Sequence, residues 1–512
     1  MDKYQITVPI PTQGINYADD SLIADNEAAE GTINISFREG QPQTRKGYAK
    51  QTLFSHVGEA TPITKLAFHS VATKDRLLFA SDKRLYQFNS DLTPILRSLG
   101  VIGSHKPNFL PIACALSASY PYTDKVLVAD GIRFKWFDET HGLTDIPPYE
   151  PNLNEVNAYG VNVLSSAAHE IHGQKFILND DNRVWLGGYG GMVRISHLGT
   201  AGAMPDYWPS SQVFRLPSDC TGMARFMGEV ILFTESEAFL ISGSTPIFSM
   251  QGNYVNTALP GGYGCSQHDS IAIGNNAIYW ANKRGVYRYR YLPSGYSIPE
   301  CVSEFVTLDG RSRTIRPEID KITDWSKVFA TFVNHEYRLY TGNGIVMVYD
   351  TISQTWTKYA YASSFNCGVE HNHSLYYGGA TIGTSSKYWI YQMDEGLSDD
   401  GTNFDAVLLS KVLDFEKAAN RKRFRRLYFS LYSEFIDYNI DLTYTIDGDP
   451  ATIQNAIVYD GTSLDQKATN LNFPIKLKHR KKRYNLQFQL KSTGGAWLLL
   501  NVVLMLKIKE LR

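Results

Sequence analysis

The chain has 512 residues and a formal net charge of −1, from 50 Lys and Arg against 51 Asp and Glu. This balance argues against a strong overall attraction to nucleic acid, and the 43% hydrophobic content argues against wholesale disorder. The 13% aromatic content, together with 40 Gly, favours strands and tight turns, so we expect an all-β protein.

The N-terminal residues 1–61 precede the first repeated pattern of the chain. Residues 21–48 read "SLIADNEAAEGTINISFREGQPQTRKGY", which predicts a helical turn, a short strand and a basic turn. Residues 1–14 lack a basic region followed by an apolar run, so we expect no secretory signal. We predict that residues 1–61 form a segment that packs on the β domains.

A hairpin pattern recurs seven times between residues 62 and 400. Each copy has an apolar strand, a polar turn of two to four residues and a second strand rich in aromatics. The copies cover residues 76–89, 125–138, 175–188, 229–243, 277–290, 337–350 and 374–394.

The spacing of these hairpins indicates the architecture. Their second strands begin at intervals of 42–60 residues, and a four-stranded propeller blade takes about 40–50 residues. Further strand-like runs fit into the gaps, for example residues 62–70, 108–117, 269–280 and 328–336. We therefore predict an irregular β-propeller over residues 62–400 with seven blades; six blades or an incomplete ring are the alternatives.

The chain changes character after residues 394–405, where glycine and acidic residues predict a linker. Longer runs with period-two alternation follow, as in "NIDLTYTI" and "NLQFQLKS", and they predict a C-terminal β-sandwich over residues 405–512. The longest apolar run, residues 497–506, contains Asn501 and is too short to span a bilayer. We expect a buried strand there and no stable membrane insertion.

Candidate sites for catalysis or metal binding are weak. His169 and His172 lack the spacing of a zinc-protease helix, and His371 and His373 lack an assignable third ligand. Residues 179–192 mix acids with glycines without an EF-hand pattern, so a polar turn before a bulged strand is the simpler interpretation. The five scattered cysteines favour neither a disulfide framework nor a zinc site. We assign no catalytic, cofactor-binding or metal-binding residue, and no cofactor.

Two basic runs are the most unusual local feature, and both are predicted at strand starts of the C-terminal domain. Together they predict one positive patch that faces phosphate or an acidic partner; the alternative is protection of sheet edges by Lys and Arg. The residues are Arg421, Lys422, Arg423, Arg425, Arg426, Lys476, Lys478, Arg480, Lys481, Lys482 and Arg483.

The N-terminal segment also carries a family resemblance. It shows Leu-x-x-x-x-Glu-Ala, then an Asn-containing strand, then an Arg-x-Gly-Tyr turn, in which Lys46 stands where proline is frequent. With the propeller and the basic sandwich behind it, this segment resembles the tail-hub or nozzle proteins of short-tailed bacteriophages, the packaged-DNA stabilisation proteins. The matching residues are Leu22, Glu27, Ala28, Asn34, Arg45, Gly47 and Tyr48.

The resemblance implies a non-enzymatic structural protein of the virion tail, made in the host cytoplasm. Such proteins form a ring, a hexamer by resemblance, that continues the DNA channel below the portal and adaptor rings and retains packaged DNA until ejection. The implied partners are further copies of the chain, the portal–adaptor ring, other tail proteins and, transiently, double-stranded DNA. Within the segment we expect Arg45 and Tyr48 to anchor it to the β domains.

Two other classes of function stay open. One is a propeller that binds or hydrolyses carbohydrate, such as a receptor-binding protein, which predicts a polar, acid-rich central pocket. The other is a cellular interaction scaffold built on a propeller.

Overall fold

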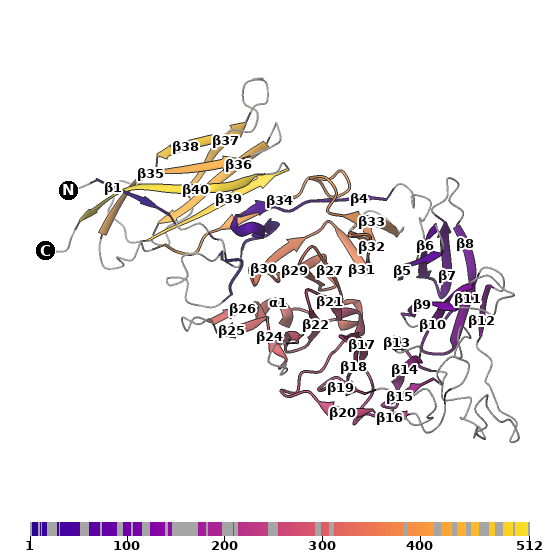
Figure 1. The fold of residues 1–512 in the computed structure, drawn as a ribbon. Coiled ribbons are helices and arrows are strands. Elements are labelled where there is room, and N and C mark those ends of the chain that lie inside the picture. Colours follow the sequence, from indigo (N-terminus) through magenta and orange to yellow (C-terminus); the bar gives the residue numbers. More distant parts are fainter. Residues whose placement is uncertain are drawn as a thin grey trace, which may run out of the picture.

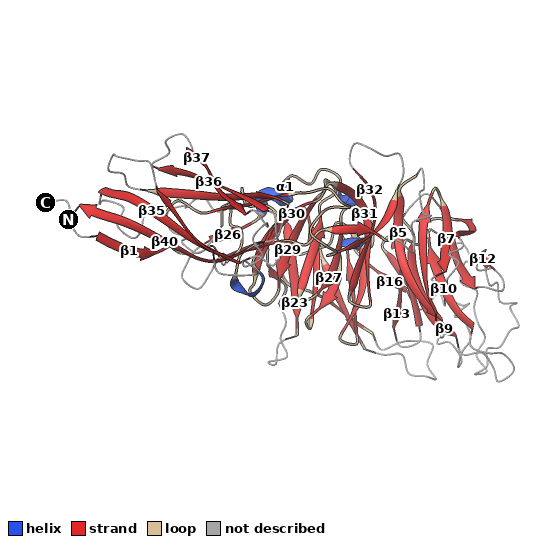
Figure 2. Ribbon diagram, turned by 90° about the horizontal axis from the view of Figure 1, so that it is seen from above, coloured by secondary structure: helices blue, strands red, loops and turns tan. Residues whose placement is uncertain are grey.

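The computed structural model describes residues 3–8, 11, 13–17, 28–29, 31–51, 61–71, 74–89, 96–103, 106–114, 123–138, 142–145, 173–180, 183–196, 208, 213–243, 254–291, 298–306, 312–381, 388–413, 421–432, 438–446, 452–459, 471–476, 485–494 and 497–509. Figure 1 shows a ring of small sheets with a longer pair of sheets at one side. Seen from above in Figure 2, that pair extends away from the ring and makes the molecule elongated.

Seven four-stranded antiparallel sheets form the ring and are the blades of a β-propeller. Blade one is β5 (Ile63–Val71), β6 (Lys74–Ser81), β7 (Arg84–Asn89) and β8 (Leu96–Val101). Blade two is β9 (Asn108–Cys114), β10 (Thr123–Ala129), β11 (Phe134–Asp138) and β12 (Gly142–Asp145). Blade three is β13 (Phe176–Asp180), β14 (Arg183–Tyr189), β15 (Met192–Ile195) and β16 (Val213–Arg215). Blade four is β17 (Gly222–Phe226), β18 (Glu229–Phe233), β19 (Ala238–Ser242) and β20 (Val255–Ala258).

The remaining blades follow the same plan. Blade five is β21 (Ala272–Gly274), β22 (Ala277–Asn282), β23 (Gly285–Arg290) and β24 (Glu300–Cys301). Blade six is β27 (Phe329–Val333), β28 (Glu336–Tyr340), β29 (Ile345–Asp350) and β30 (Thr355–Ala360). Blade seven is β31 (Ser363–His371), β32 (Ser374–Thr381), β33 (Trp389–Met393) and β4 (Tyr48–Lys50).

The first strand of each blade is innermost, and β31 of the last blade contacts β5 of the first, so the ring is closed. The middle strands are buried on both faces, as in the fully buried β28, because each blade packs between two neighbours. Tight turns use paired left-handed residues, for example Asn275 with Asn276 and Asn334 with His335, which is typical of two-residue hairpins.

The predicted fold class is confirmed: the chain is nearly all-β, with a propeller of seven blades. Six of the seven predicted hairpins are the second and third strands of a blade. The copy at residues 175–188 differs, because β13 and β14 are the first and second strands of blade three. The runs predicted to fill the gaps form β5, β9, β21 and β27.

Blade seven differs from the other six in the origin of its outer strand. β31, β32 and β33 are consecutive, but the fourth strand, β4, comes from the N-terminal segment. It pairs antiparallel with β33, with Tyr48 opposite Met393 and Lys50 opposite Tyr391. The N-terminal segment therefore completes the last blade.

The longer pair of sheets is a β-sandwich. One sheet has the order β2 (Ile35–Ser36), β3 (Gln43–Thr44), β40 (Leu498–Lys509), β35 (Arg421–Tyr432) and β38 (Leu471–Lys476), with β1 (Lys3–Thr7) also on β40. The other is β34 (Asp405–Leu409), β39 (Leu486–Thr493), β36 (Tyr438–Ile446) and β37 (Thr452–Tyr459). Their facing side chains share a core with Val8, Ile35 and Phe37, so the N-terminal segment is part of the sandwich as well.

Few other elements occur in the described chain. The strands β25 (Glu304–Val306) and β26 (Ser312–Thr314) and the helix α1 (Arg316–Asp320) lie between blades five and six. Three 3-10 turns are η1 (Arg38–Gly40), η4 (His268–Ser270) and η5 (Trp325–Lys327). None of the helices in the described ranges is both long and apolar enough to cross a membrane.

Candidate functional site at the propeller–sandwich junction

Arg45 is the centre of the junction between the two domains. The Arg45 residue is 2% exposed, and its guanidinium donates to both carboxylate oxygens of Asp399, at 2.8 and 2.7 Å. Its other three N–H groups donate to the Asn34 side chain and to the carbonyls of Lys46 and Ala360. All five donors of the guanidinium are thus used, which is the condition under which a buried charge is tolerated.

Aromatic rings cover the Arg45 guanidinium. Its Cζ lies 4.1 Å from the centroid of Tyr361 and 3.7 Å from that of Phe404. Tyr361 follows blade six and Phe404 precedes β34 of the sandwich. These cation–π contacts therefore connect the propeller to the sandwich through one N-terminal side chain.

Asn34 supports Arg45 from the same segment. Its φ of 60° lies in the left-handed region, which Asn tolerates better than most residues. Its amide donates to the Asp405 carbonyl at 2.7 Å, and its side-chain oxygen accepts from the backbone N–H of Ala360 at 2.7 Å. One side chain thus hydrogen-bonds the first strand of the sandwich sheet and the last strand of blade six.

Gly47 and Tyr48 complete the anchor where the segment enters blade seven. A Cβ on Gly47 would lie 2.0 Å from the Ser398 carbonyl oxygen, so only glycine fits. The Tyr48 hydroxyl shares a hydrogen bond of 2.6 Å with Ser363, and its ring packs edge-on against Phe365 and Tyr391. Burial raises the pKa of Tyr48 far above its usual value, so the hydroxyl stays protonated.

The expectation that Arg45 and Tyr48 anchor the segment is therefore confirmed. Of the other resemblance residues, Asn34 and Gly47 belong to the same junction, and Ala28 is fully buried in the sandwich core. Leu22 and Glu27 lie outside the described residues. Asp399, Tyr361 and Phe404 could not be found from the sequence, because single acidic or aromatic residues far along the chain carry no pattern that pairs them with Arg45.

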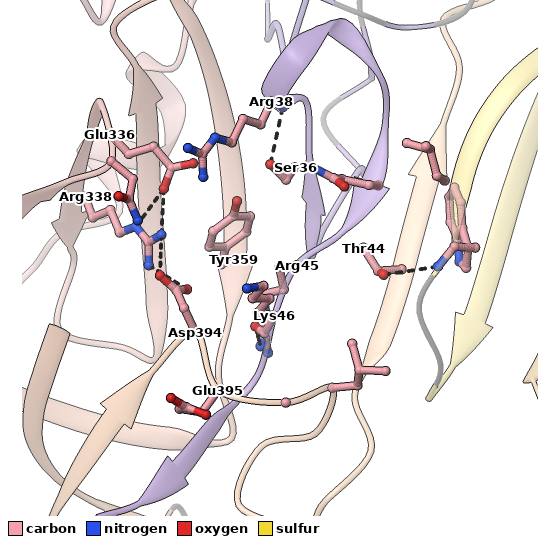
Figure 3. Close-up of a pocket in the computed structure, with 16 residues that line it drawn as sticks. Ser36, Arg38, Thr44, Arg45, Lys46, Glu336, Arg338, Tyr359, Asp394 and Glu395 are labelled. Carbon is pink, nitrogen blue, oxygen red and sulfur yellow. Dashed lines mark hydrogen bonds and ion pairs between the residues drawn. The ribbon is translucent and has the colours of Figure 1, made fainter. Parts of the chain in front are cut away.

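A cleft of about 700 Å³ opens beside this anchor. Figure 3 shows Arg38 and Lys46 of the N-terminal segment on one side, with Glu336, Arg338 and Asp394 of the propeller opposite. Arg338 donates to Glu336 at 2.6 Å and to Asp394 at 2.9 Å. Burial alone would lower the pKa of Arg338, but these two carboxylates outweigh that effect and raise it.

The two walls of the cleft carry opposite charge. On the propeller wall, the carboxylates of Glu336, Asp394 and Glu395 exceed the single cation of Arg338. On the opposite wall, Arg38 and Lys46 are exposed, and the described part of the chain offers neither of them an ion-pair partner. Such a cleft is suited to hold a segment with charges of both signs.

The described residues of the basic runs lie on strands of the sandwich and do not line this cleft. The first opens β35 at Arg421, as predicted. The second was predicted at a strand start, and this is wrong at Lys476, which is the last residue of β38. The reason is that β38 pairs antiparallel with β35, so the end of β38 lies beside the first half of β35, with Lys476 opposite Arg426. Lys478, Arg480, Lys481, Lys482 and Arg483 lie outside the described residues.

Backbone register nevertheless brings further cations beside the first run. Arg421 is opposite Lys509 and Arg423 is opposite Lys507, and Lys507 is in turn opposite Lys3. Three adjacent strands therefore end in basic residues at one end of the sandwich. Both chain termini are labelled at that end in Figure 2, on the side away from the propeller.

The remaining candidates do not assemble into a metal site in the described ranges, where no group of three or more His, Cys, Asp or Glu could hold an ion. His371 ends β31 and stacks on Phe68, while His373 is exposed in the following turn. β14 has a register shift between Leu186 and Tyr189, as the bulged-strand interpretation predicted. His169 and His172 lie outside the described residues, and Cys220, Cys265, Cys301 and Cys367 are free thiols.

No protein-family model matches the chain, and no curated protein sequence matches it. Solved structures with a similar fold include the computationally designed Ika8 protein (14% identity, 67% of this chain and 99% of that one, TM-score 0.34). A second is BamB from Moraxella catarrhalis, with 12% identity over 65% of this chain and 84% of that one and a TM-score of 0.35. A third is BBS1N in complex with ARL6DN, with 9% identity over 70% of this chain and 99% of that one and a TM-score of 0.40. These likenesses concern the fold alone.

Proposed function

We propose that this protein is a non-enzymatic structural subunit of a bacteriophage tail, in the manner of the tail-hub or nozzle proteins. The observation that carries the proposal is the position of Asn34, Arg45, Gly47 and Tyr48. These residues, on which the sequence resemblance depends, all lie at the junction that locks the propeller to the sandwich. A resemblance in these residues is therefore a resemblance in how two domains are joined.

A rigid junction suits a subunit of a ring. Heterologous contacts close into a ring only if each copy presents its two contact surfaces at a constant angle. The buried Arg45–Asp399 pair and the strands that the N-terminal segment gives to both domains hold that angle constant. The ring would continue the DNA channel below the portal and adaptor rings and retain DNA until ejection.

The basic end of the sandwich supplies a contact surface in this proposal. Cations from β1, β35 and β40 are adjacent in register there, and a local positive patch attracts phosphate or an acidic partner even on a chain of near-zero net charge. A ring through which DNA slides needs contacts of this weak, sequence-independent kind.

The carbohydrate alternative has less support from the central cavity of the propeller. Among the described residues that line it, two are acidic, Asp269 and Glu370. Asp269 is paired with two lysines, which outweigh the effect of burial and hold its pKa far below the usual range. A glycosidase acid needs a raised pKa.

Negative-stain microscopy of the purified protein, alone and with the portal–adaptor complex of its phage, tests the proposal. We expect ring-shaped oligomers, at least in the presence of the complex. Reversal of Arg423, Arg425, Lys481 and Lys482 to Glu should impair ring assembly or docking while the fold survives; the matched control reverses the exposed propeller residues Lys283 and Lys327. Monomers under every condition would contradict the proposal.

A further inference from the structure

The inner strands of all seven blades enclose a cavity of about 620 Å³ at the axis of the propeller. Its wall is mostly apolar and includes Phe68, Phe109, Leu178, Ile271, Phe329 and Val369. A concave apolar wall with a few polar groups of fixed position is the usual form of a small-molecule site.

The polar groups gather around η4, which lies inside the ring and contacts β17, β22 and β27. Its Asp269 accepts a hydrogen bond from Lys65 of blade one and lies 3.4 Å from the Nζ of Lys106, in the segment before blade two. Lys106 also donates to the Asn366 carbonyl of blade seven at 3.1 Å. These contacts cross the axis of the propeller and hold the three charges in place.

The charges of this cluster do not cancel. Lys65 and Lys106 supply two cations and Asp269 one anion, and all three side chains are largely buried. Of the other charged groups that line the cavity, Arg225 pairs with Asp180 at 2.6 Å. Glu370 keeps its negative charge, but it is exposed near the end of β31 and accepts from the backbone N–H of His373. One positive charge is therefore in excess beside η4.

His268 adds a neutral donor to the cluster. Its Nδ1 accepts from the backbone N–H of Met223 at 3.4 Å, and its ring packs on Phe176. Burial, with the charge of Lys65, lowers the pKa of His268 to about 4, so at neutral pH the ring carries its proton on Nε2. Within the described residues no acceptor takes that N–H.

One side of the cavity wall is a flat aromatic surface. The rings of Phe68 and His371 stack with centroids 4.0 Å apart and planes 7° apart, and Tyr376 packs against Phe68 at 5.1 Å. Phe68 and His371 both line the cavity and are only partly buried. A planar apolar group can stack beside them.

We propose that the axial cavity of the propeller binds a small monocarboxylate with an aromatic or apolar body. The carboxylate would contact Lys65 and the Nε2–H of His268, with the charge of Lys106 beside Asp269 adding attraction, and the body would lie against the apolar wall near Phe68. This site is independent of the proposed role in a phage tail, because it needs neither a ring nor a partner chain.

Isothermal titration with three probes of the same shape tests the site. Phenylacetate, 2-phenylethanol and 2-phenylethylamine share a ring and differ in charge. We expect one site for phenylacetate, with 2-phenylethanol bound at least roughly tenfold more weakly, since a hydrogen bond between two charged groups is stronger than one to a neutral hydroxyl. The amine should bind most weakly, because the excess charge repels it.

Variants assign the binding to these residues. Lys106→Met leaves the Lys65–Asp269 pair intact and removes the excess charge, so phenylacetate affinity should fall roughly tenfold while 2-phenylethanol is unaffected. Phe68→Ala should weaken both probes, and Lys283→Met, on the 68%-exposed surface lysine, should change neither. Thermal unfolding checks that each variant folds.

The proposal is overturned if phenylacetate gives no binding heat at millimolar concentration, or if it binds no better than 2-phenylethanol. It is also overturned if folded Lys106→Met binds phenylacetate as tightly as the unaltered protein. Should Lys106→Met fail to fold, Lys65→Arg provides the decision. That variant keeps the charge but changes the shape of the donor. We expect it to retain selectivity for the acid over the alcohol, and a folded Lys65→Arg protein without that selectivity overturns the proposal.

Discussion

Blades six and seven are neighbours with the same four-stranded plan, but they are closed in different ways. All four strands of blade six come from residues 329–360, joined by short turns. Blade seven takes three strands from residues 363–393 and its outer strand, β4, from residues 48–50. β30, the outer strand of blade six, pairs along six residues, whereas β4 pairs along three.

The difference shows that side chains hold β4 more than its ladder does. Three paired residues make few backbone hydrogen bonds, and two-stranded pairing of that length is not stable alone. Side-chain contacts of Arg45 and Tyr48 add to this short ladder. Arg45 uses all of its N–H donors, including two to Asp399, and the Tyr48 ring packs among other aromatic rings. Since the same segment forms β2 and β3 of the sandwich, loss of its anchor should loosen both domains together.

Arg45→Met should have the largest effect. It leaves Asp399 buried without its cation, and breaking a buried pair in this way costs about 3–5 kcal/mol. Urea unfolding should show that loss, and hydrogen exchange should accelerate in β33 of blade seven before β29 of blade six. Arg38→Met, on an exposed residue of the same segment, is the control. A small loss that is equal in both variants would mean that β4 does not depend on Arg45.

Gly47→Ala should come next. Its Cβ would meet the Ser398 carbonyl at 2.0 Å, which is backbone and cannot move aside as a side chain can. We expect a loss of about 1–3 kcal/mol, as for other overpacked sites, measured by urea unfolding with Lys46→Ala as control. If the two variants are equally stable, the segment has room to shift and the junction is looser than its contacts indicate.

Tyr48→Phe separates the hydroxyl from the ring. The aromatic packing remains and only the hydrogen bond to Ser363 is lost, so the expected loss is about 0.5–1.5 kcal/mol. A double-mutant cycle with Ser363→Ala measures the coupling between the two hydroxyls. If the free-energy losses of the two single variants simply add in the double variant, the two hydroxyls are not coupled. The stabilising contribution of Tyr48 would then come from its ring alone.

Lys50→Met should have the smallest effect. Lys50 pairs with Asp400 at 2.7 Å, but its side chain is 39% exposed, and exposed pairs contribute about 0–1 kcal/mol. The Arg45–Asp399 and Lys50–Asp400 pairs join the same two segments, so comparing their unfolding free energies isolates the effect of burial. A Lys50→Met loss as large as that of Arg45→Met would remove this distinction.

The repeated parts of the molecule could be predicted from sequence and the closing parts could not. Alternation and turn residues locate β22–β23 or β28–β29, because each hairpin is local in the chain. β4 is three residues long and pairs with β33 from the other end of the propeller, so no local pattern reveals it. The Arg-x-Gly-Tyr turn was the only visible trace of that closure.

The same limit applies to the sites. The basic run at Arg421 is contiguous and therefore visible in the sequence, whereas Arg45 and Asp399 are single residues separated by 354 positions. The cluster at the propeller axis draws Lys65, Lys106 and Asp269 from three separate segments. Charge excess in such a cluster depends on which residues meet, and composition does not contain that information.

The closure of blade seven also constrains how the protein is made. During synthesis at about 5–20 residues per second, β4 emerges early, but its partner β33 is completed only after some tens of seconds. The interval between synthesis of a strand and synthesis of its partner is still longer for β1 and β3, because both pair with β40 at residues 498–509. Residues 43–50 are thus made long before their partners, and the propeller is complete only after β33 is made and the sandwich only after β40 is made.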